Sequence, residues 1–261
     1  MKLLSAYMPT RGTSFIKASL VMLMLASLIG CASQKGEGAD GEPNVLTAEK
    51  LYDLAKGRME SKNFRRAIQI YEALEVRFPF SEFTRQGQLD LMYAHFRSNN
   101  TQSAVEAATR FIRENPRHPK ADYAYYMRGL ANFPVGLTAL ERVFRVSPYA
   151  RPQDKAAKSF DAFSTLIQRY PDSEWAEDAR QRMVYLRNAM AKYELEVAEY
   201  YLRRGANIAA ANRAKRVIDE FQETDAVLEA LRIQIAAYNN LELTDLASDA
   251  QRVLDQNLSK Q

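Results

Sequence analysis

The side chains that most often carry catalysis are scarce in this chain, which has two histidines and one cysteine among 261 residues. His95 lies between Tyr93 and Phe96 in a helical pattern, which favours packing in a core or groove over proton transfer. His118 precedes Pro119 in a predicted turn, where a solvated ring is expected. The sequence contains no paired-histidine metal motif, nucleophile elbow or phosphate-binding loop. It therefore indicates no enzyme, no cofactor and no metal site.

The one cysteine, Cys31, indicates a covalent modification instead. It follows Leu28-Ile29-Gly30, the end of an uncharged run that begins at Ala18 and comes after a positively charged segment. Such a short run cannot span a bilayer as a helix, which needs about 20 apolar residues. The arrangement resembles the lipobox of bacterial lipoproteins. It predicts cleavage of a signal peptide, residues 1–30, which begins at Met1 or Met8. Cys31 would then carry S-diacylglycerol and an N-palmitoyl group.

Residues 31–44 have no apolar periodicity and are predicted to form a flexible tether, with turn residues Gly36, Gly38, Gly41 and Pro43. Ala32, rather than an aspartate, follows Cys31. By resemblance to bacterial lipoproteins, this implies a lipid anchor on the periplasmic face of the outer membrane of a Gram-negative bacterium. If Cys31 stays unmodified, the alternative is a soluble periplasmic chaperone.

The net charge does not point to nucleic acid. The formal charge is +4, and three of the basic residues, Lys2, Arg11 and Lys17, belong to the predicted signal peptide. Their removal leaves +1 (4 − 3) from side chains. A mature chain of this charge has no basic footprint for a polyanion, so no nucleic-acid partner is expected.

A helical pattern recurs along the rest of the chain. Residues 67–79 carry apolar side chains at helical spacing and end in a proline. The same small, bulky, bulky and stop positions appear three times: Ala67, Tyr71, Leu74 and Pro79; Ala104, Ala108, Phe111 and Pro116; Ser159, Phe163, Leu166 and Pro171. Weaker matches follow near residues 210 and 246. The prediction is an all-α, right-handed superhelical solenoid of about five tetratricopeptide repeats, about ten helices, over residues 45–258.

The predicted repeats span residues 47–79, 81–116, 119–171, 173–222 and 225–258. The third contains an insert, 132–152, in which Val135–Val146 could form a short helix. The fourth opens with a helix from Ser173 to about Arg204, roughly 48 Å long. This exceeds what its partner helix, Asn207–Phe221, can cover, so the C-terminal part of the long helix is expected to be exposed.

Most aromatic residues in the chain are expected to pack between repeats, but one turn carries more than packing requires. Phe78 and Phe80 flank Pro79, with Arg65 at the preceding turn. Together these residues could take an aromatic-ended peptide and its terminal carboxylate.

A second set of aromatic residues lies on the part of the long helix that is expected to be uncovered. Tyr193, Glu199 and Tyr200 belong to it, together with Glu194 and Tyr201. An exposed aromatic patch of this kind indicates a protein interface.

Several segments together resemble a known family: Arg77-Phe78-Pro79-Phe80, residues 88–94 and 126–130, and the block 192–213. They are similar to the tetratricopeptide-repeat lipoprotein subunits of the bacterial outer-membrane β-barrel assembly machinery. The resemblance implies a non-enzymatic scaffold and substrate receptor. Its C-terminal half would bind the periplasmic domains of the barrel-forming subunit, and it would contact smaller lipoprotein subunits. Its N-terminal repeats would receive the C-terminal signal of unfolded β-barrel substrates.

Carried onto this chain, the resemblance makes Asn212 and Arg213 the expected contact with the barrel-forming subunit. Arg65, Phe78, Phe80 and Tyr93 are the expected contacts with substrate peptide. Two alternatives remain: another outer-membrane tetratricopeptide lipoprotein, such as a pilus-secretin assembly factor, and an enzyme that acts on the cell wall. The absence of convergent catalytic residues in the sequence speaks against the enzyme.

Overall fold

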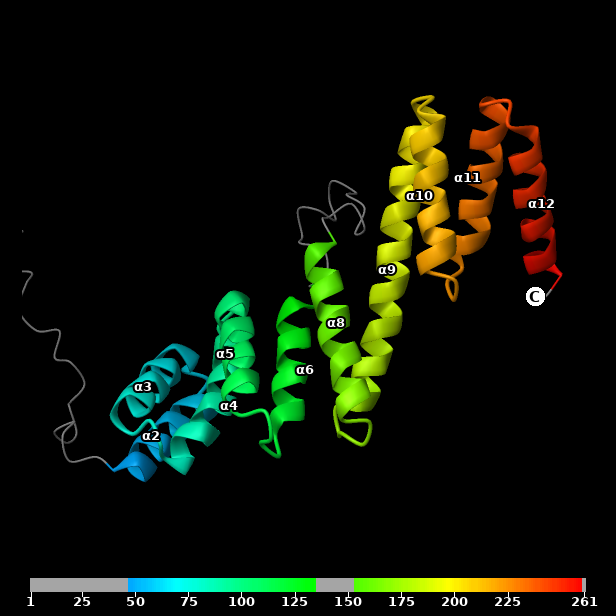
Figure 1. Cartoon of the computed structure of the whole chain (residues 1–261). Helices are drawn as coiled ribbons and strands as arrows, with labels where there is room; N and C mark the ends of the chain where they lie inside the picture. The colour runs from blue at the N-terminus through cyan, green and yellow to red at the C-terminus, as the bar shows by residue number, and fades with distance from the viewer. Residues whose placement is uncertain (1–46, 135–152, 260–261) are drawn as a thin grey trace, which may run out of the picture. The chain divides into compact units, whose positions relative to one another are not determined.

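A computed structural model describes residues 47–134 and 153–259 of the chain (Figure 1). These residues form ten α-helices and no strand, which confirms the all-α prediction. Cys31, the tether and the short helix predicted at 135–146 lie outside the described residues. The helices are α2 (Ala48–Glu60), α3 (Phe64–Arg77), α4 (Glu82–Arg97), α5 (Thr101–Glu114), α6 (Ala121–Asn132), α8 (Asp154–Arg169), α9 (Ala176–Arg203), α10 (Asn207–Glu220), α11 (Ala226–Asn240) and α12 (Thr244–Leu258).

Four of the turns between helices share one backbone geometry, which accounts for the repeat. In each, one residue takes a positive φ and the amide of the next donates a hydrogen bond back to the carbonyl five residues earlier, which closes the end of the preceding helix. The residues with positive φ are Lys62 (59°), Asn99 (63°), Gly205 (73°) and Glu242 (60°). The amides of Asn63, Asn100, Ala206 and Leu243 make the backward bonds, at 2.9–3.0 Å.

Consecutive helices are neighbours throughout, and α6 packs directly against α8 across residues 135–152. Some alternate helices also touch, namely α2 with α4, α4 with α6, and α9 with α11. Contacts limited to near neighbours in sequence are typical of solenoids. The right-handed superhelical sense stays a prediction.

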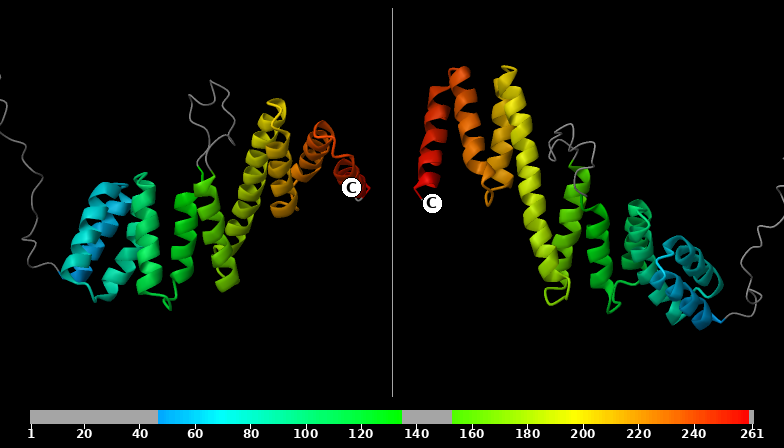
Figure 2. Two further views of the ribbon diagram at one scale, coloured as in Figure 1. Left: turned by 45° about the horizontal axis from the view of Figure 1, so that its top comes forward. Right: turned by 180° about the vertical axis from the view of Figure 1, so that it is seen from behind.

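The long helix α9 joins two hydrophobic cores. Its N-terminal part packs on α8, and its C-terminal part packs on α10 and α11 (Figures 1 and 2). The expectation that its C-terminal part is uncovered is therefore wrong. The chain reverses at Gly205, so α10 must run back along the end of α9 that it has just left. The N-terminal part, which α10 cannot reach, is covered by α8.

The start of α9 also differs from the prediction, because the helix begins at Ala176 and not at Ser173. The Ser173 hydroxyl donates to the Asp122 carboxylate at 2.7 Å and accepts from the Trp175 amide at 3.2 Å. Ser173 thus fastens the turn to α6 instead of capping the helix.

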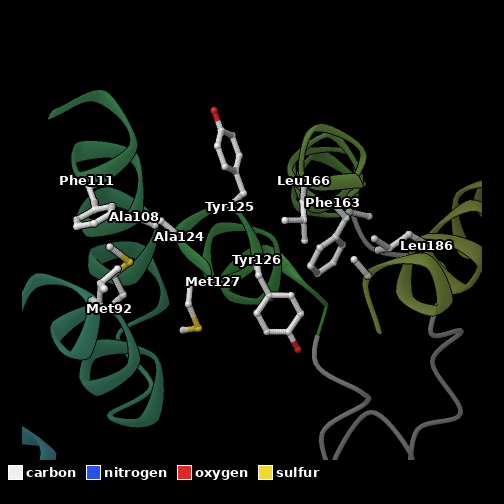
Figure 3. Close-up of a cluster of buried hydrophobic side chains, with 13 residues drawn as sticks. Met92, Ala108, Phe111, Ala124, Tyr125, Tyr126, Met127, Phe163, Leu166 and Leu186 are labelled. Atoms are coloured by element: carbon white, nitrogen blue, oxygen red, sulfur yellow. The ribbon is translucent and has the colours of Figure 1, made fainter. Parts of the chain in front are cut away.

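We call the buried residues of α4 to α8 and the N-terminal part of α9 the first core. The loss of water contact by large side chains stabilises this region. Its α6–α8 contact is close: a Cβ on Gly129 would lie 2.5 Å from the Phe163 ring, so only glycine fits there. Figure 3 shows Phe163 beside Leu166, with Tyr125 and Tyr126 projecting to opposite sides of α6. The members are Leu89, Met92, Ala108, Phe111, Ala124, Tyr125, Tyr126, Met127, Ala156, Phe163, Leu166, Ala179 and Leu186.

The second core lies between the C-terminal part of α9, α10 and α11. Alanine dominates it, which lets the helix backbones approach closely. Its members are Ala191, Ala198, Ala210, Ala211, Ala214, Val217, Phe221, Ala226, Ala230, Ile233 and Ala237.

Candidate binding surfaces

The residues predicted to hold a substrate peptide lie at two ends of α3. Arg65 is in its first turn, and Phe78 is its C-cap. They are 13 positions apart in sequence (78 − 65), which corresponds to roughly 20 Å along the helix axis. Phe80, two residues after Phe78, is 91% exposed. Arg65 and the Phe78–Phe80 turn are therefore placed to contact different parts of an extended peptide, and their joint capture of one terminal residue stays a prediction.

Tyr93 lies at the Arg65 end of α3, in a small cluster with Phe64 and Arg97. The Tyr93 and Phe64 rings meet edge-on with centroids 6.5 Å apart. The Arg97 guanidinium donates to the Tyr93 hydroxyl at 2.6 Å and lies 5.2 Å from the centre of the Phe64 ring. Tyr93 is half-buried and held by these contacts, so only part of its surface is available to a peptide.

A half-buried aspartate surrounded by tyrosines is a feature that the sequence reasoning missed. The Tyr71 hydroxyl donates to the Asp90 carboxylate at 3.1 Å. Burial raises the pKa of Asp90, against the effect of hydrogen bonds from Tyr52 and Tyr71. Burial and the nearby Asp90 charge raise the pKa of both tyrosines. The sequence signal for this buried carboxylate was the position of Asp90 between two apolar residues, Leu89 and Leu91.

At the other end of the chain, a buried carboxylate holds two arginines. The Glu194 side chain is 7% exposed; its oxygens accept from Arg213 at 2.7 Å and from Arg216 at 3.0 Å. The hydrogen bond to Glu194 raises the pKa of Arg213. Arg213 therefore has a partner within the chain. Glu194 was expected on an exposed surface, and that expectation is wrong because its side chain is buried. The sequence did carry a signal: Glu194 shares the apolar face of α9 with Ala191, Leu195 and Ala198.

Asn212 is exposed beside the turn between α9 and α10, where it lines a pocket of about 460 Å³. Ile208 and Leu241 line the same pocket, and Ile208 is 66% exposed. The sequence reasoning missed Ile208, although an isoleucine in the first turn of a helix, away from its apolar stripe, is a detectable signal.

The remaining predicted interface residues lie along α9. Tyr200 is 48% exposed, with the Arg204 guanidinium 5.4 Å from its ring centre. Glu199 pairs with Arg203 at 3.4 Å. Tyr193 is half-buried and close enough to contribute to the raised pKa of Arg213. Tyr193 is thus partly covered, whereas Tyr200 is available to a partner.

Within residues 47–134 and 153–259, no group of three or more His, Cys, Asp or Glu side chains could hold a metal ion. No helix in these same ranges is both long and apolar enough to cross a membrane.

The helix pairs, the recurring turn and the exposed aromatic and apolar side chains define a helical-repeat protein that offers surfaces for binding. A family model described as outer membrane lipoprotein (YfiO) matches residues 45–254, and the chain belongs to this family.

Several curated relatives are named outer membrane protein assembly factor BamD. The relative from Neisseria gonorrhoeae is 40% identical over 94% of this chain and 92% of its own length. The relative from Vibrio cholerae is 36% identical over 90% of this chain and 96% of its own length. The relative from Haemophilus influenzae is 30% identical over 94% of this chain and 92% of its own length. Among solved structures, a crystal structure of MamA protein has a TM-score of 0.32 and 17% identity over 82% of this chain and 91% of that chain. This similarity is too low to carry an argument.

Proposed function

We propose that this chain is an assembly factor for outer membrane proteins, a non-enzymatic scaffold and substrate receptor of the β-barrel assembly machinery. Lipids on Cys31 would hold it at the periplasmic face of the outer membrane. The observation that carries the proposal is the 40% identity, over 94% of the chain, to a protein named outer membrane protein assembly factor BamD. The helical-repeat fold supports it, because such folds act through extended binding surfaces.

Depletion of the protein in its own cells tests this function. As it is depleted, we expect folded β-barrel proteins to disappear from the outer membrane while unfolded forms accumulate in the periplasm, as seen by their electrophoretic mobility without heating. A Cys31→Ala variant tests the anchor by fractionation, and mass spectrometry of the mature N-terminus identifies the lipids. Unchanged β-barrel levels after complete depletion would overturn the proposal.

The C-terminal half is our candidate for the contact with the barrel-forming subunit and the smaller lipoproteins. Asn212 and Ile208 offer a polar and an apolar group at one pocket, and Tyr200 adds an exposed aromatic ring. Glu194 fixes Arg213 in one orientation, which lowers the entropy that a partner must remove on binding.

Tyr200→Ala tests this contact by co-purification with the barrel-forming subunit. We expect a loss of about tenfold or more in recovery, as for an aromatic hot spot. Tyr185→Ala is the matched control, because Tyr185 lies on the same helix and is also 48% exposed. Equal recovery with both variants would show that Tyr200 is not in the interface. Arg213→Glu is a poor test, because its new carboxylate would face Glu194 and disturb the fold.

The N-terminal repeats are our candidate for the receptor of unfolded substrate. Phe80 is the most accessible of the predicted residues, and it lies near Phe83, which is partly exposed and packs on Tyr52 with ring centroids 5.9 Å apart. We expect a photocrosslinker at Phe80 to capture unfolded β-barrel chains. Since Arg65 is some 20 Å away along α3, it would contact a different part of an extended peptide.

A further inference from the structure

A polar groove lies between α3 and α5, with α4 forming its floor. It consists of two adjoining pockets, of about 400 Å³ and 410 Å³, that share Glu72, His95 and Ser103 in their walls. An ion pair between Glu75 of α3 and Arg110 of α5, at 3.0 Å, joins the two sides. Of the predicted substrate residues only Arg65 lines it, in the wall of the 410 Å³ pocket.

The 400 Å³ pocket is negatively charged. Its walls carry three carboxylates, from Glu72, Glu75 and Glu106, against the single guanidinium of Arg110. That is an excess of two negative charges (3 − 1). Arg110 is paired with Glu75, which also accepts from the Gln88 amide at 2.8 Å. Glu72 and Glu106, which are both exposed, therefore supply the charge that a ligand would meet.

The floor of the groove holds a buried histidine with an unsatisfied ring nitrogen. His95 is 8% exposed and lines both pockets, and its Nδ1 finds no hydrogen-bond partner in the described part of the chain. Burial lowers the pKa of His95, with Arg110 adding to this and Glu72 and Glu106 opposing it. The ring is thus neutral at pH 7. Nδ1 is shielded from solvent, so a ligand must turn the ring toward the groove to reach it. Because a buried polar atom without a partner is costly, a ligand that does so and supplies a hydrogen-bonding group is favoured.

We propose that this groove binds an arginine side chain carried by an extended segment of a partner protein. The guanidinium matches the charge of Glu72 and Glu106 and presents five N–H donors in a planar fork. Two carboxylates, the Ser103 hydroxyl and the imidazole can use these donors. The planar guanidinium can also lie against the flat ring of His95. This site is separate from the exposed aromatic residues at Phe80 and from the surface near Asn212.

The two histidines of the chain make the test direct. NMR of the purified, isotopically labelled protein gives ring signals for His95 and His118, and only His95 lies in the groove. Titration with acetyl-Gly-Arg-Gly-amide should shift the His95 signals in a saturable way and leave those of His118 unchanged. The same peptide with citrulline, which has the shape of arginine without its charge, should bind at least about tenfold more weakly.

Glu72→Gln and Glu106→Gln complete the test, because both positions are exposed and the substitutions keep the fold. Each should weaken binding of the arginine peptide about tenfold, with the unshifted His118 signals confirming an intact structure. Three outcomes would overturn the proposal: no saturable shift of His95, equal shifts with arginine and citrulline, or unchanged binding by both variants. None of these depends on the assembly function, since the measurement needs only the isolated protein.

Discussion

The two cores that α9 joins are built from different side chains. In the first, Phe111, Phe163, Met92 and Leu166 are among the largest fully buried residues of the described chain. In the second, eight of the eleven buried members are alanine, and the buried carboxylate of Glu194 lies beside them on α9. The helix α9 thus packs against large side chains in its N-terminal part and against alanine-rich helices in its C-terminal part.

The difference predicts how each region can be damaged. Large buried side chains stabilise the first core through the apolar area they remove from water, so truncation should harm it most. An alanine core offers little area to lose and little space to fill, so enlargement should harm it most. The ion pairs of Glu194 with Arg213 and Arg216 join α9 to α10, so their loss is also expected to loosen this core.

The largest effect is expected from Phe163→Ala in the first core. Loss of a fully buried phenylalanine typically costs about 3–5 kcal/mol of unfolding free energy. Urea unfolding followed by the fluorescence of Trp175 measures it. Trp175 is the one tryptophan of the chain and stacks on Tyr126 with ring centroids 4.8 Å apart. Phe80→Ala, at an exposed position, is the control and should change stability by less than about 0.5 kcal/mol. Equal losses would contradict the assignment of the first core.

Next in size is Ala198→Leu in the second core. Added methyl groups in a close-packed contact cost about 1–3 kcal/mol. Hydrogen exchange of the α10 and α11 amides should quicken while that of α6 and α8 stays nearly unchanged. Ala157→Leu, at an exposed position of α8, should have little effect on either region. If Ala198→Leu also leaves the hydrogen exchange of α10 and α11 unchanged, the helices of the second core are not close-packed.

Glu194→Gln should lower the unfolding free energy somewhat less, by about 1–2 kcal/mol, because Arg213 and Arg216 are partly exposed and can be hydrated. The measurement is again hydrogen exchange in α10. Glu199→Gln removes an exposed ion pair with Arg203 and should cost less than about 0.5 kcal/mol. A Glu194 variant as mild as the Glu199 variant would show that the buried carboxylate does not hold α9 and α10 together.

The smallest effect is a pH dependence specific to the N-terminal region. Burial lowers the pKa of His95 in the folded protein. Below its ordinary pKa of about 6.5, the unfolded chain then binds a proton more readily than the folded one, so stability falls as pH drops. His95→Gln should reduce this loss between pH 7 and pH 5, as measured by urea unfolding at each pH. An identical pH profile in the variant would mean that another group titrates.

Much of the fold was predictable because helix caps and the spacing of small and bulky residues can be recognised in short stretches of sequence. Thr47 is of a residue type that favours a helix N-cap, and its side chain accepts from the Lys50 amide at 3.3 Å. The recurring small and bulky positions identified residues that are buried, such as Ala67, Ala104 and Phe163. These positions repeat because each helix meets a similar neighbour.

The candidate surfaces were harder to predict because they depend on which helices meet. A residue count between Arg65 and Phe78 did not reveal that α3 separates them by its full length. The length of α9 indicated an uncovered part, but not that α8 and α10 divide the helix between them. The pairing of Glu194 with Arg213 follows from that arrangement, so it could not be read from either residue alone.

Photocrosslinking in intact cells tests most directly the claim that the N-terminal repeats and the C-terminal half bind different partners. A photoreactive residue in place of Asn212 should capture the barrel-forming subunit, whereas one in place of Phe80 should capture unfolded β-barrel chains. Val184, exposed on the N-terminal part of α9, serves as the background position. Recovery of the same proteins from both sites, or of none above the Val184 background, would contradict the account.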